Sequence, residues 1–81
     1  MEWVEIIELT EEVIRIRYYP EQRGAVGEYG EITYFRKTDD WQFDKLVSKY
    51  GTQYALHACK AAQRCHKNGN FPKNGGVIGW C

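Results

Sequence analysis

An alternation of apolar and polar side chains over residues 13–19 constrains the fold of this chain more than any other feature. The alternation runs through Ile14, Arg15, Ile16, Arg17, Tyr18 and Tyr19. A period of two with one polar face is typical of an antiparallel sheet that buries only one side. Residues 3–9 are a second segment rich in strand formers, and the polar link Thr10-Glu11-Glu12 between the two segments predicts an antiparallel hairpin.

A third strand and a helical region follow a loop with three glycines at residues 21–30. Residues 31–37 alternate again and predict a strand. Asp39 and Asp40 have the character of a helix start, and an apolar stripe then recurs at i, i+3, i+4 and i+7. The stripe consists of Phe43, Leu46, Val47 and Tyr50. Since residues 53–67 carry a narrow face of small side chains, we expect helix over 40–67, as one bent helix or as two separated at Gly51. Residues 77–80 predict a final edge strand.

These elements predict an α+β fold, in which a three- or four-stranded, mainly antiparallel sheet carries one long bent helix or two helices on one face. The chain of 81 residues forms a single small domain, 1–81, and a domain of this size buries only about 60% of its unfolded surface. The predicted core contains Ile6 or Ile7, Ile14, Ile16, Tyr18, Phe43, Leu46, Val47, Ala58 and Cys65.

The formal net charge of zero conceals two oppositely charged halves. Residues 1–40 hold ten acidic and five basic residues, a net charge of −5, and residues 41–81 hold one acidic and six basic residues, a net charge of +5. Such asymmetry bears on partners and association rather than on the fold. Most of the acids fall on polar strand faces or loops, where they are solvated. Glu5 is the exception, because it shares a predicted strand face with apolar residues.

The basic residues of the second half concentrate on the predicted helix. Lys60, Arg64 and Lys67 recur at i, i+4 and i+7, so they share one helical face, which Lys45, Lys49 and Lys73 extend. This face is either a binding surface for an acidic protein or for phosphates, or a solvated face near a helix C-terminus, where cations are favoured. With aromatic rings added as contacts, the candidate partner-binding residues are Lys60, Arg64, Lys67, Trp41, Phe71 and Trp80.

No residue pattern in the chain predicts catalysis, a metal site or a cofactor. His57, Cys59, Cys65 and His66 are close in sequence, but their spacing on a helix does not bring them to one zinc ion. Cys59 and His57 are two residues apart and so do not face each other as a nucleophile and its base would. The glycines match no nucleotide-binding motif. We therefore predict a non-enzymatic protein.

The N-terminus and the cysteines indicate the cell compartment. The acidic start of the chain lacks the basic segment of a secretory signal, and no apolar run approaches the ~20 residues of a membrane span. The three cysteines are an odd number without regular spacing, which is typical of reduced thiols. The sequence therefore predicts a cytoplasmic protein that does not contact membranes.

Scattered segments of the chain resemble a group of small Firmicute and prophage proteins that carry no assigned activity. The resemblance rests on Tyr18-Tyr19-Pro20-Glu21, residues 27–30, Tyr54, His57-Ala58, Gly69-Asn70-Phe71-Pro72, Gly76 and Trp80. It implies a bacterial or phage origin and a cytoplasmic location, and it adds no site residue.

Together these features predict a small module that binds a protein partner, or a second copy of itself as a homodimer, through charge complementarity and exposed aromatic rings. Nucleic-acid binding through the basic helix face is an alternative that uses Lys60, Arg64 and Lys67 as phosphate contacts. A phage-encoded inhibitor of a host defence protein is a further alternative, which follows from the resemblance to prophage proteins.

Overall fold

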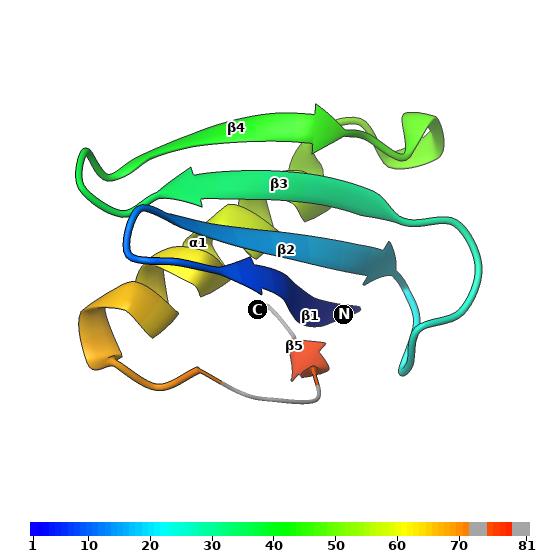
Figure 1. Ribbon diagram of the computed structural model, residues 1–81. Helices are drawn as coiled ribbons and strands as arrows, with labels where there is room; N and C mark the ends of the chain where they lie inside the picture. Colours follow the sequence, from blue (N-terminus) through cyan, green and yellow to red (C-terminus); the bar gives the residue numbers. More distant parts are fainter. Residues whose placement is uncertain (72–74, 79–81) are drawn as a thin grey trace.

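The computed structural model describes residues 1–71 and 75–78, which form an antiparallel sheet with a helix across one face (Figure 1). The strands are β1 (Glu2–Leu9), β2 (Val13–Pro20), β3 (Gly30–Phe35), β4 (Asp40–Lys45) and β5 (Gly76–Ile78). They lie in the order β4-β3-β2-β1-β5, and every neighbouring pair is antiparallel. A short 3-10 helix (Ser48–Tyr50) precedes α1 (Gln53–Asn68). The predicted α+β class is confirmed.

The predicted hairpin of β1 and β2 is also confirmed. Its turn is closed by Thr10, whose Oγ1 accepts hydrogen bonds from the backbone N–H groups of Glu12 at 3.2 Å and Val13 at 3.0 Å. In β2 the alternation seen in the sequence places Ile14, Ile16 and Tyr18 in the core. A hydroxyl that holds two backbone donors fixes the register of the hairpin, and so it fixes which side chains of β2 are buried.

Residues 40–50 form a strand and a 3-10 helix, so the helix predicted over 40–67 is wrong in its first half. Trp41 and Phe43 alternate with polar residues, which over six positions fits a strand as well as a helix. Asp39 adopts a left-handed backbone with a φ of 61°, and its N–H donates to the Phe35 carbonyl oxygen over 2.9 Å. Aspartate tolerates this conformation in turns, so Asp39 closes the β3–β4 hairpin and does not begin a helix.

This change moves two predicted core residues to the surface. Phe43 and Leu46 are 37% and 41% exposed, because β4 is the outer strand of the sheet on that side and lies beyond the cover of α1. Val47, which follows β4, is buried as predicted. The predicted apolar stripe of residues 43–50 is therefore split between an exposed sheet edge and the core.

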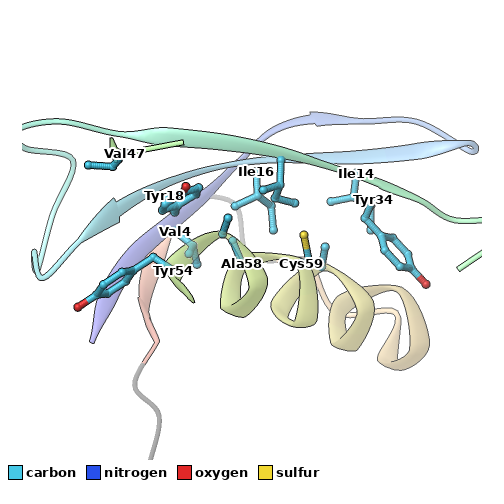
Figure 2. Close-up of a cluster of buried hydrophobic side chains, with 12 residues drawn as sticks. Val4, Ile14, Ile16, Tyr18, Tyr34, Val47, Tyr54, Ala58 and Cys59 are labelled. Atoms are coloured by element: carbon cyan, nitrogen blue, oxygen red, sulfur yellow. The ribbon is translucent and has the colours of Figure 1, made fainter. Parts of the chain in front are cut away.

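The core lies between α1 and the central strands (Figure 2). Its buried members are Val4, Ile14, Ile16, Tyr18, Ile32, Tyr34, Val47, Tyr54, Ala55, Ala58, Cys59 and Ala62. Three alanines on the inward face of α1 let the helix approach the sheet closely, as the small-residue pattern predicts. The tyrosines supply large buried areas around them.

Two details of the predicted core are settled by local geometry. A bulge in β1 between Ile6 and Glu8 places Ile6 opposite Ile16 and leaves Ile7 as the extra, 37% exposed residue. On α1 the thiol in the core belongs to Cys59, and the predicted Cys65 is only half-buried. Alanines occur on several faces of this helix, so the sequence does not reveal that its buried face is centred nearer Ala55 than Ala61.

Gly30, at the start of β3, is required by the close approach of Tyr18. A Cβ atom added at Gly30 would lie 2.2–2.5 Å from three atoms of the Tyr18 ring. Tyr18 is fully buried, and its hydroxyl donates to the carbonyl oxygen of Lys45 at 3.4 Å. The ring therefore has little space into which it can move.

We expect Gly30→Ala to destabilise the protein by about 1–3 kcal/mol, because the new methyl group overpacks the site against Tyr18. Urea unfolding followed by tryptophan fluorescence measures the change. Gly24→Ala is the matched control, since nothing lies within 4 Å of a Cβ at Gly24. Equal stability of the two variants would contradict the packing described here.

Candidate partner-binding surfaces

The outward face of α1 carries the basic residues that the sequence singles out. Lys60, Arg64 and Lys67 are all exposed, and we call them the basic stripe. The inward face of the same helix holds the core alanines, so packing on the sheet orients the stripe toward solvent. No acidic residue lies within α1, and no ion pair joins the stripe to a carboxylate of the described residues.

The positive charge of the basic stripe changes the pKa of nearby titratable groups. The pKa of His57 is lowered, first by burial and then by the charges of Lys60, the N-terminal ammonium and Arg64. The pKa of Asp39 is also lowered, chiefly by hydrogen bonds from Tyr34 and Gln63 and to a smaller extent by Lys67. Lys67 therefore lies close enough to an acidic turn for their charges to interact, and Lys60 and Arg64 act on His57.

The aromatic residues singled out by the sequence do not form an exposed platform beside the stripe. Trp41 lies opposite Tyr34 in the β3–β4 pair and packs half-buried against the core. Phe71 also packs against the core, and the Arg36 guanidinium carbon lies 5.3 Å from the centre of its ring. Both rings are therefore half-buried, and their role in partner binding stays a prediction. Trp80, Lys73 and Cys81 lie outside the described residues.

The sheet face opposite α1 is covered by its own charged and aromatic side chains. Glu31 is the centre of this layer, since its carboxylate accepts hydrogen bonds from Arg15 at 3.1 Å and from Arg17 at 2.8 and 3.0 Å. The ring of Tyr29 lies 4.4 Å from the Arg17 guanidinium carbon and 3.9 Å from Lys45 Nζ. We call these five residues the paired layer. Their long side chains satisfy one another and shield the strands beneath.

Sequence reasoning recognised the polar face of β2 but missed this pairing. The signal that would have found it is register, because Arg17 lies directly opposite Glu31 in the β2–β3 pair. Opposite charges at facing positions stabilise a sheet. The arginines of the sheet are therefore engaged within the molecule, in contrast to the bases of α1.

Glu2 is the buried acid of this protein, whereas the sequence draws attention to Glu5, which shares a strand face with apolar residues. The side chain of Glu2 is 0% exposed, and neither of its carboxyl oxygens has a hydrogen-bond partner in the described structure. Burial raises its pKa to about 8, against a smaller opposing effect of the N-terminal ammonium. Glu5 is half-buried on the other face of β1 and accepts a hydrogen bond from the Tyr19 hydroxyl at 3.3 Å.

The thiols and histidines have structural surroundings. Burial raises the pKa of Cys59 to about 12, and burial also raises the pKa of the half-buried Cys65. Both shifts are opposite to the lowered pKa of an activated thiol. His66 Nδ1 accepts a hydrogen bond from Arg36 Nε at 3.1 Å, which ties α1 to the end of β3. Among the described residues, no group of three His, Cys, Asp or Glu side chains is placed to hold a metal ion.

Comparisons of the chain with protein-family models, with curated proteins and with solved structures found no match. The resemblance to small Firmicute and prophage proteins therefore stays a prediction. Within the described part of the chain, no helix has the length and apolar character needed to cross a membrane.

We expect Glu2→Gln to remove a pH-dependent loss of stability. The pKa of Glu2 rises from 4.5 to about 8 on folding, so the carboxyl is neutral in the folded protein while the unfolded chain ionises above pH 4.5. Below pH 4.5 the carboxyl is protonated in both states, so its ionisation does not reduce the stability of the folded protein. Above that pH the free energy of unfolding falls by up to about 1.4 kcal/mol per pH unit as the pH rises toward 8.

Urea unfolding at pH 5, 6.5 and 8 tests this expectation. The difference in stability between Glu2→Gln and the wild-type protein should move in favour of the variant as the pH rises. Glu11→Gln, in the exposed β1–β2 turn, controls for the loss of a carboxyl group. A difference for Glu2→Gln that stays constant over this range would refute the burial of an ionisable Glu2.

Proposed function

We propose that this protein is a non-enzymatic binding module that attaches to an acidic surface of a partner protein through the basic stripe of α1. The observation that supports this proposal is the contrast between the two charged faces. The arginines of the paired layer donate to Glu31, whereas Lys60 and Arg64 are exposed and without an ion-pair partner among the described residues.

Unpaired surface cations are the groups that gain most from an external partner. The charges of the paired layer already have intramolecular partners, so an incoming surface would first have to displace them. Within residues 1–71 and 75–78 no carboxylate competes for Lys60 and Arg64, and they project from a helix that is packed on the sheet by its opposite face. Complementary charges of this kind accelerate association and select the partner.

The surroundings of the stripe favour an acidic protein over nucleic acid. Exposed acids occupy the two turns at one end of the sheet, at Glu11 and Glu12 and at Asp39 and Asp40. The turn that contains Asp39 lies close enough to Lys67 for their charges to interact. A long phosphate backbone laid along the stripe would approach these acids, whereas a compact acidic patch contacts Lys60 and Arg64 alone.

Replacing the stripe with acidic residues should abolish partner capture. In a tagged pull-down from bacterial lysate, with and without nuclease, we expect the wild-type protein to retain a stoichiometric protein after nuclease treatment. The double variant Lys60→Glu, Arg64→Glu, which reverses the two stripe residues that contact the partner, should lose at least about 90% of it, because two attractive contacts become repulsive.

The matched control reverses two exposed bases elsewhere and so changes the net charge equally. Arg23→Glu, Lys37→Glu serves this purpose. Equal loss in both variants would argue against a local site. Recovery of nucleic acid, or of proteins that disappear after nuclease treatment, would replace the proposal with nucleic-acid binding. Sedimentation of the purified protein at low and high salt distinguishes self-association, and a captured host defence enzyme that loses activity would identify an inhibitor.

A further inference from the structure

A cleft of about 290 Å³ opens between β1 and the C-terminal half of α1. Its floor is apolar and is formed by Val4, Ile6 and Ile16 from the sheet and by Ala61 and Cys65 from the helix. Ile6 and Cys65 are only half-buried, so the cleft leaves apolar surface of both elements accessible. Its mouth adjoins the outward face of the helix that carries the basic stripe.

The position of α1 on the sheet explains the cleft. A helix with its side chains is about 10–12 Å wide, whereas neighbouring strands are spaced about 4.8 Å apart. α1 packs chiefly on β2 and β3, so it leaves β1 incompletely covered. The small side chain of Ala61, which faces β1, does not fill the remaining space.

The rim of the cleft carries polar groups of a particular kind. Arg64, Asn68 and Asn70 line it on the side of the helix and of the segment that follows it. Glu5 lines it on the side of β1, but its carboxylate accepts a hydrogen bond from Tyr19 on the opposite face of the sheet. Arg64 is thus a basic-stripe residue and a cleft residue at once, and a guanidinium is suited to hold a carboxylate.

We propose that the cleft receives an apolar side chain from the acidic partner segment, while a neighbouring carboxylate of that segment binds Arg64. This inference rests on the proposed function and adds the chemistry of the partner's anchor. The apolar floor excludes a purely charged contact, and Arg64 with the two asparagine amides selects an acidic residue beside the anchor. Partner recognition commonly depends on one such buried anchor surrounded by polar contacts.

The volume of the cleft favours a side chain of a partner segment over a free small molecule. Ligand pockets are typically about 300–1,000 Å³ and bury most of the ligand. This cleft is at the lower limit of that range, so it has room for one large side chain. An anchor that is carried by a partner segment gains further contacts at the stripe, which a free ligand of that size cannot make.

Two short peptides test the anchor directly. Both are blocked at their ends and carry two acidic residues on each side of a central position, which is phenylalanine in one peptide and alanine in the other. We expect the phenylalanine peptide to bind about tenfold more tightly in NMR titrations at low salt, because its ring is partly removed from water. The resonances of the apolar residues Ile6, Ile16 and Cys65 of the cleft floor should shift with this peptide only.

A matched pair of variants tests whether the phenylalanine side chain binds in the cleft. Cys65→Phe fills the space, so the variant should bind both peptides equally. Cys65→Ser leaves the cleft open and should keep the preference for phenylalanine. Lys60→Glu, which alters the stripe outside the cleft, should weaken both peptides to the same degree. If Cys65→Phe does not fold, the rate of Cys65 alkylation in a Cys81→Ser background provides the second measurement, and only the phenylalanine peptide should slow it.

The outcomes separate this inference from the proposed function. Equal binding of the two peptides, weakened by Lys60→Glu, would overturn the anchor and leave the acidic partner standing. A preference for phenylalanine that persists in Cys65→Phe would place the anchor elsewhere and overturn it too. Free N-acetylphenylalanine that binds as tightly as the peptide would make the cleft a small-carboxylate site instead. No binding of either peptide at millimolar concentration would refute the proposed function as well.

Discussion

The width of a single helix is the constraint on which the rest of this structure depends. The outer strands of a five-stranded sheet lie about 19 Å apart, and a helix covers only about 10–12 Å. The chain places α1 over β2 and β3, where its alanines belong to the same buried cluster as Ile14 and Ile32. The parts of the sheet nearer its two edges are covered by other side chains or stay exposed. On the β4 side Phe43 stays 37% exposed, and on the β1 side a cleft remains.

The same constraint explains how the charges are distributed. Since no second layer covers the opposite face in the described part of the chain, the sheet covers itself with long side chains, which pair across β2 and β3 around Glu31. This pairing uses bases and acids from the first half of the chain. Three of the six bases of the second half lie on α1, which contains no acid to pair with them. The bases that form ion pairs thus lie on the sheet face, whereas the bases of the helix face have no ion-pair partner among the described residues.

The parts of the fold that sequence predicts are those that local pattern decides. The period of two in β2 decides which face of the strand is buried, since only one face carries both Ile14 and Ile16. Residues 40–50 satisfy a strand and a helix about equally, and the choice depends on the pairing of Trp41 with Tyr34, which is a tertiary contact. The bases of the stripe were found from helical spacing alone. The burial of Glu2 and the cleft were not, because both arise where β1 meets elements distant in sequence.

Because the inward face of α1 is committed to the core, only its outward face and its flank beside β1 remain for a partner. Arg64 stands at the border of these two regions and can hold a carboxylate whose neighbour enters the cleft. The two regions then contribute different things. Exposed charges act over a distance and raise the association rate, whereas an apolar anchor acts only on contact and lowers the dissociation rate. The surface of a small module is limited. Because Arg64 belongs to both regions, the module selects acidic segments that also carry an apolar side chain.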